Sequence, residues 1–145
     1  MLVLAAAPVA DLIKGYEMKV SDEGDAVELY MPPEVGLKWL ELRKLSPTSE
    51  SALEEYRKAS PAALLPVTFP LLLLFGDADA DVPPELIRHY AAEAAGELVT
   101  TVEVPGADHF QVVDASSACW QSHVRPALAE LLGRHWGAEA ARALL

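Results

Sequence analysis

The stretch "PLLLLFGD", Pro70 to Asp77, decides the fold that the sequence predicts. Its residues 71–75 are apolar without interruption, and a proline and a glycine bound the run. A short apolar run between turn-forming residues is typical of a strand that is buried on both faces, as in a parallel sheet. Parallel strands are joined by crossover connections, usually helices, so this run favours an α/β chain.

Two further segments supply the neighbouring strands. Residues 2–7 form a second apolar run that ends at Pro8, and we expect a strand buried on both faces there. Residues 97–104, "ELVTTVEV", are β-branched and alternate in polarity, which predicts a third strand. The sequence therefore predicts a small, partial parallel sheet flanked by helices.

Helices are predicted between and after these strands. One starts at Thr48 or Ser49 and runs through Lys58, and another opens at Pro83-Pro84-Glu85 and closes at Gly96. A third begins at Asp114 or Ser116 and continues towards Gly133, with a kink or break at Pro126. Residues 37–45 have weak helical spacing, residues 138–145 suggest a final helix, and residues 8–36 show little periodicity.

Composition limits the possible classes of protein. The 145 residues suffice for one domain, and 52% apolar with 23% charged residues is an ordinary globular balance. The net charge of −11 argues against nucleic acids and anionic membranes as partners, because no basic stripe is present to neutralise phosphates. No apolar run is long enough to span a bilayer. A single cysteine, Cys119, suits a reducing compartment, so we expect a cytoplasmic protein.

Two loops that follow predicted strands carry the chemically active side chains. "GDADADVPPE" follows the strand at 71–75, and "PGADHF" follows the strand at 98–104. Ligands of α/β sheets bind at the carboxyl ends of the strands. A carboxylate on the first loop could hold the Nδ1–H of His109 on the second, which would fix its tautomer for work as a general base.

The same segments resemble the C-terminal half of α/β-hydrolases, closest to the esterase and kynurenine-formamidase-like branch. The acid loop of that family reads roughly G-x-x-D-x-x-V-P, and Gly76, Asp79 and Val82-Pro83 match it. The His loop reads roughly P-G-x-x-H-F, which Pro105 to Phe110 match. The likeness is strong over residues 59–132 and looser over residues 4–12. It implies that Asp79 is the catalytic acid, that His109 is the base, and that no cofactor is needed.

The nucleophile of that family is not found in these residues. Family members carry a G-x-S-x-G elbow and an earlier H-G-G-like oxyanion loop, and neither motif occurs here. We therefore expect residues 1–145 to be one incomplete α/β-hydrolase domain, without a nucleophile and almost inactive alone. The implied reaction is hydrolysis of a small carboxylic ester or aryl-formyl amide. Ser46, Ser60, Ser116, Ser117 and Cys119 are weak substitutes, since none lies in a Gly-flanked elbow.

The remaining polar residues of the two loops and the other histidines have simpler interpretations. Asp108 is expected to be a turn residue, and Asp77 and Asp81 solvated loop acids. An EF-hand over residues 77–88 fails because Val82 replaces the glycine and Arg88 the final glutamate. His89, His123 and His135 are expected at the surface, and no H-x-x-x-H pair occurs, so no metal site is predicted.

Two alternatives to a hydrolase half remain open. The chain could be a non-catalytic interaction or structural domain of hydrolase-like fold, or an enzyme with an unorthodox nucleophile. A half sheet also leaves an edge strand and apolar surface uncovered. Association through that sheet edge is therefore a further expectation.

Overall fold

We describe a computed structural model of the chain, in which residues 2–18, 20, 50–96 and 98–143 are described. The chain divides into two compact units, one of Met1–Pro8 with Pro66–Leu145 and one of Val9–Leu65. The expected helix at residues 37–45 and the expected cap at Thr48 or Ser49 lie outside the described residues. The expectation of a single domain concerns how the two units combine, and it stays a prediction.

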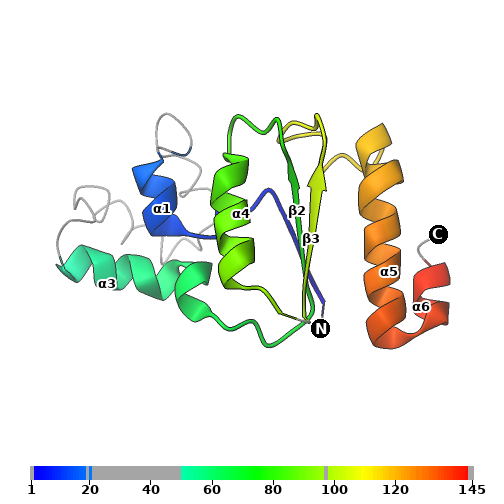
Figure 1. Cartoon of the computed structure of the whole chain (residues 1–145), viewed down its shortest axis with the longest axis horizontal. Coiled ribbons are helices and arrows are strands. Elements are labelled where there is room, and N and C mark those ends of the chain that lie inside the picture. Colours follow the sequence, from blue (N-terminus) through cyan, green and yellow to red (C-terminus); the bar gives the residue numbers. More distant parts are fainter. Residues whose placement is uncertain (1, 19, 21–49, 97, 144–145) are drawn as a thin grey trace, which may run out of the picture. The chain divides into compact units, whose positions relative to one another are not determined.

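The first unit is built on a parallel sheet of three strands in the order β1-β2-β3. These are β1 (Val3–Ala6), β2 (Leu71–Gly76) and β3 (Val99–Val104). All six residues of the central strand β2 are buried, which confirms the prediction from its apolar run. The parallel sheet with helices places this unit in the α/β class, as the sequence predicted (Figure 1).

Helices lie on both sides of this sheet. α4 (Pro84–Glu93) follows β2, and α5 (Arg125–Trp136) follows β3 and lies on the opposite side (Figure 1). α6 (Ala138–Arg142) packs against α5. The core between the sheet and the helical segment before α5 includes Leu74, Val104, Val112 and Val124, each no more than 1% exposed.

The helical run that reaches α5 begins with a wide turn. Ser117 starts it, because its Oγ accepts a hydrogen bond from the backbone N–H of Trp120. A π-helical segment, η3 (Trp120–Val124), leads into α5, and Pro126 occupies the first turn of that helix. The expected split of the helix at Pro126 is not found, since Val124 and Arg125 keep right-handed helical conformation and the run changes only from π to α geometry. Proline is tolerated there because the first turn of an α-helix does not need its missing N–H.

The second unit contains two α-helices and a short 3-10 turn among its described residues. They are α1 (Leu12–Glu17), α3 (Glu50–Ala59) and η2 (Pro61–Leu64). Asp11 caps α1 by accepting from the N–H groups of Ile13 and Lys14. Buried Ser60 joins the two helical segments, since its Oγ accepts from the N–H of Leu12.

Four further expectations about the elements were wrong. β1 is not buried on both faces: Leu4 is 36% exposed, because β1 pairs with β2 alone among the described strands. Residues 12–17 form a helix where no periodicity was seen. α4 ends at Ala94 in right-handed conformation, so Gly96 is not its left-handed cap. Ser117, not Asp114 or Ser116, caps the helical run before α5.

Candidate active site

Asp79 lies in the loop between β2 and α4, which we call the acid loop (residues 77–83). Its side chain is completely buried. One carboxylate oxygen, Oδ1, accepts hydrogen bonds from the backbone N–H groups of Asp81 and Val82 at 2.9 and 2.8 Å. These two bonds form a turn that fixes the carboxylate and leaves the second oxygen, Oδ2, for another partner.

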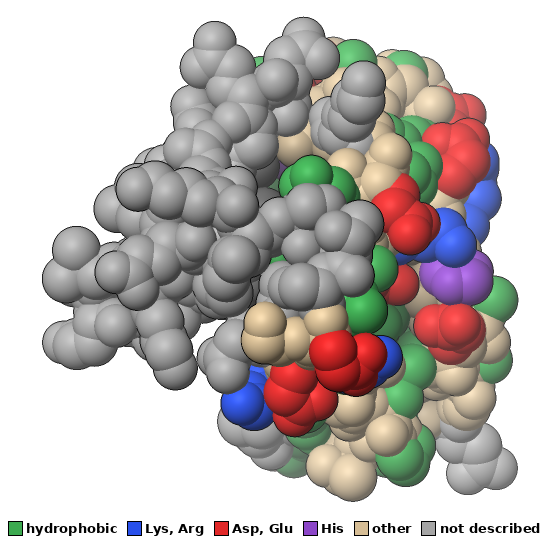
Figure 2. Space-filling view, turned by 90° about the vertical axis from the view of Figure 1, so that its left-hand side faces the viewer, with side chains coloured by type: hydrophobic (Ala, Val, Ile, Leu, Met, Phe, Trp, Pro, Cys, Tyr) green, Lys and Arg blue, Asp and Glu red, His purple; other side chains and the backbone are tan. Residues whose placement is uncertain are grey.

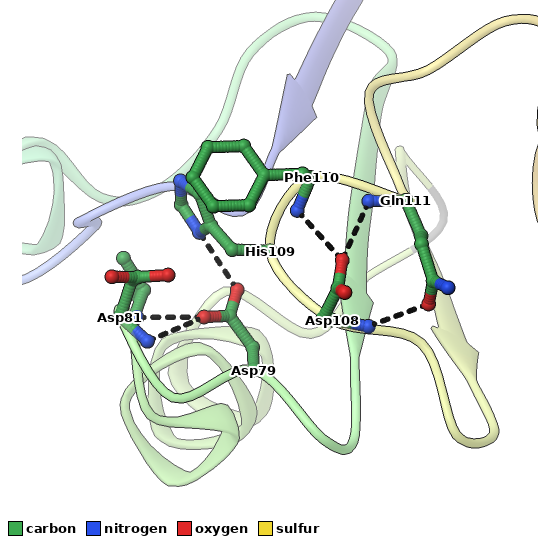
Figure 3. Close-up of polar contacts among 7 residues, drawn as sticks. Asp79, Asp81, Asp108, His109, Phe110 and Gln111 are labelled. Atoms are coloured by element: carbon green, nitrogen blue, oxygen red, sulfur yellow. Dashed lines mark hydrogen bonds and ion pairs between the residues drawn. The ribbon is translucent and has the colours of Figure 1, made fainter.

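His109 lies in the loop after β3, which we call the His loop (residues 105–113). Pro105-Gly106 begins it with a sharp turn in which Gly106 has a φ of +69°, a conformation that favours glycine. Asp108 then accepts from the N–H groups of Phe110 and Gln111, as expected of a turn residue (Figure 3). The result is a short, internally bonded loop that presents His109 towards Asp79.

The two loops are held together by backbone contacts. The N–H of Asp77 donates to the carbonyl of Val104, and the N–H of Ala78 donates to the carbonyl of Ala107. The Asp77 side chain also accepts from the N–H of Gly106, so this exposed acid has a structural partner that the sequence did not indicate. These hydrogen bonds fix the two loops relative to each other without any contribution from the Asp79 and His109 side chains.

The expected contact between Asp79 and His109 is present. His109 Nδ1 lies 2.9 Å from Asp79 Oδ2, and the histidine side chain is 24% exposed (Figure 3). A carboxylate accepts and does not donate, so the proton of this bond lies on Nδ1. Nε2 of the neutral ring then carries a lone pair, and no hydrogen bond to another described residue occupies it. This is the arrangement of a histidine prepared to take a proton.

Apolar side chains border the pair. Phe110 is 70% exposed and makes an edge-to-face contact with the His109 ring, with centroids 5.4 Å apart. Val113, on the same loop, is 51% exposed. Two exposed apolar side chains of the His loop therefore lie near a polar pair of which Asp79 is buried and His109 is partly exposed.

None of the described substitutes for a serine nucleophile is prepared for that role. Ser60 is buried and bonded to the backbone of Leu12, and Ser117 caps a helix. Ser116 donates to Asp114, a hydrogen bond that lowers the pKa of that carboxyl. Burial raises the pKa of the Cys119 thiol, which favours the unreactive protonated form. Ser46 lies outside the described residues.

Of the three other histidines, all expected at the surface, one differs from that expectation. His123 is exposed, and His89 is partly exposed and lies 3.3 Å from Glu93. His135 was expected at the surface, but its Nε2 is buried without a hydrogen-bond partner in the described chain. None of these three is in contact with the Asp79–His109 pair.

The other histidine–carboxylate contact among the described residues, between His89 and Glu93, is partly exposed on α4. The Lys and Arg side chains visible in Figure 2 lie beside acidic ones. Arg88, for example, donates to both carboxylate oxygens of Glu103, which lowers the pKa of Glu103. No helix in the described part of the chain is both long and apolar enough to cross a membrane.

Comparison with protein-family models, with curated proteins and with solved structures finds no match to this chain.

Proposed function

We propose that Asp79 and His109 are the acid and the base of a serine-hydrolase-type site. The observation that carries this proposal is the 2.9 Å contact between His109 Nδ1 and a completely buried carboxylate. In the proposed reaction, Nε2 takes the proton of a serine hydroxyl as that oxygen attacks a carbonyl carbon. Asp79 keeps the ring in the required tautomer and stabilises the imidazolium that results.

The substrate class follows from the resemblance to esterases and kynurenine-formamidase-like enzymes. We propose a small carboxylic ester or an aryl-formyl amide, whose apolar part would contact Phe110. The proposed reaction requires a serine nucleophile and oxyanion donors, and no G-x-S-x-G elbow among these 145 residues provides them. The acid and base would then complete a triad whose members follow the order Ser, Asp, His.

A fluorophosphonate probe, which reacts with activated serines, tests the complete site. We expect labelling of a polypeptide in which this sequence follows a G-x-S-x-G segment, and loss of labelling in its His109→Ala variant. His123→Ala is the matched control, because His123 is exposed and outside the pair. Labelling that survives His109→Ala would exclude His109 as the base.

Nitrogen NMR of the chain itself tests the preparation of His109. We expect the neutral ring to carry its proton on Nδ1 in the unmodified chain, because Asp79 accepts from it. Asp79→Asn should remove this preference, as an amide can donate to the ring instead. An Nε2–H tautomer in the unmodified chain would contradict the proposal, since that nitrogen could not then accept a proton.

A further inference from the structure

We propose that Asp79, Asp81 and His109 form a binding site for a first-row divalent metal ion of the zinc class. Each side chain offers one ligand atom, and these atoms all lie within 4.8 Å of one another. Figure 3 shows the three side chains side by side, two from the acid loop and one from the His loop. This proposal concerns ion binding alone and does not depend on the hydrolase function.

The spacing of two of these atoms is close to that of ligands on a shared ion. His109 Nδ1 and Asp79 Oδ2 are 2.9 Å apart. Two ligands that each lie about 2.0–2.2 Å from one tetrahedral zinc ion stand about 3.3–3.6 Å from each other. This pair therefore has to separate by about half an ångström when an ion replaces the proton between them.

Backbone hydrogen bonds orient the Asp79 carboxylate, as is common for carboxylates that bind metal ions. Its Oδ1 is already bonded to the N–H groups of Asp81 and Val82, and its side chain is completely buried. Ligand carboxylates and imidazoles are commonly oriented by such additional hydrogen bonds, which strengthen metal binding. The site thus contains one rigid ligand atom, Oδ2, whose position is fixed by the backbone.

Charge provides the second, independent reason. Asp81 is exposed, and its carboxylate has no hydrogen bond or ion pair to another described residue. Two carboxylates thus approach one another with no Lys or Arg between them in the described part of the chain. Like charges at this distance repel, and a divalent cation between them would remove that repulsion.

The ligand set selects the kind of ion. Magnesium and calcium prefer sites made entirely of oxygen, whereas imidazole suits zinc and its first-row neighbours. Three protein ligands leave at least one position for water, as in open zinc sites. An ion on Nδ1 also replaces the hydrogen bond to Asp79, so ion binding and the proposed base role of His109 exclude each other.

Calorimetric titration of the chain with zinc chloride, in buffer free of chelators, tests the proposal. We expect one site per chain that is lost in His109→Ala, with circular dichroism to confirm that the variant is folded. Asp81→Asn keeps the Asp79–His109 contact and should weaken binding by about tenfold or more. Nitrogen NMR should show the zinc-induced shift at Nδ1 of His109, not at Nε2.

Two matched variants locate the ion. Asp77→Asn removes the same charge from the same loop, and the asparagine oxygen can still accept from the Gly106 N–H that ties the two loops together. His89→Ala removes the rival pair with Glu93. Both should bind zinc as the unmodified chain does. The proposal is overturned by absence of binding, by equal affinity in Asp81→Asn, or by a shift at Nε2 alone. None of these outcomes bears on the hydrolase proposal, because probe labelling is performed without added metal.

Discussion

Gly76, the last residue of β2, controls how closely the acid loop and the His loop approach. A Cβ added there would lie 1.9 Å from the carbonyl oxygen of Ala107, a backbone atom that cannot turn away. The same carbonyl accepts the hydrogen bond from Ala78. Only a residue without a side chain therefore allows both loops to keep their bonded arrangement.

Gly76→Ala should lower the free energy of unfolding by about 1–3 kcal/mol, the usual range for forcing atoms into a packed site. Urea denaturation measures this change. We also expect weaker contact between Asp79 and His109, visible as loss of the Nδ1–H preference in nitrogen NMR.

Gly133→Ala is the control for that substitution. Gly133 lies inside α5, and an added Cβ would meet the Ala141 side chain at an ordinary 3.5 Å. Because alanine favours helices over glycine, this variant should be more stable by up to about 1 kcal/mol. Equal losses in both variants would show that the close approach at Gly76 has no special effect.

The contact between Asp79 and His109 was predictable from the sequence, but the closeness of Asp81 to them was not. The strand-end rule and the P-G-x-x-H-F pattern indicated Asp79 and His109, and the structure brings them into contact. Asp81 was interpreted as a solvated acid, and it is exposed. Its closeness to His109 could not be predicted, because it depends on a turn in which Asp79 accepts from the Asp81 N–H. Motif searches for metal sites use spacing along one element, whereas this cluster joins two loops 30 residues apart.

At the scale of elements, Ser117 determines where the helical run before α5 begins. Its Oγ accepts from the N–H of Trp120, one of the groups that a helix start leaves unbonded. Ser117→Ala should therefore cost about 1 kcal/mol in urea denaturation. Ser116→Ala should cost clearly less, because that hydroxyl bonds only the exposed Asp114 carboxylate and the backbone cap is unaffected. An equal loss in both variants would assign the effect to the turn, not to the cap.

Strong periodic signals predicted their elements well, and the final helix was also found as α6, whereas the short helix α1 was missed. β2 and β3 combine apolar or β-branched residues with clear turn residues at their ends, and both are strands. α1 has six residues, too few for a helical period to be distinguished from chance. The burial of β1 was overestimated because an apolar sequence does not reveal whether a strand lies at the edge of its sheet.

At the scale of the whole molecule, β1 is the place where association is expected. It pairs with β2 alone among the described strands, and Leu4 on it is 36% exposed. Edge strands with exposed apolar side chains add further strands readily. Light scattering should show an apparent mass that rises with concentration, and Leu4→Lys should reduce the rise because a charge on an edge opposes strand pairing.

Leu64→Lys is the matched control, since Leu64 is 68% exposed in a short 3-10 turn and has no strand to extend. It should leave association unchanged. A monomer at every concentration in the unmodified chain would refute association through β1.

The register of the sheet has a consequence for the lengths of the two loops. Gly76 and Val104 are partners at the ends of β2 and β3, so both loops start level with one another. Asp79 follows three residues later and His109 five residues later, and backbone bonds tie the intervening segments together. One inserted or deleted residue in either span would move one partner away from the other. Alignments that seek relatives of this chain should therefore forbid gaps in residues 76–79 and 104–109, and permit them between Val113 and Ser117.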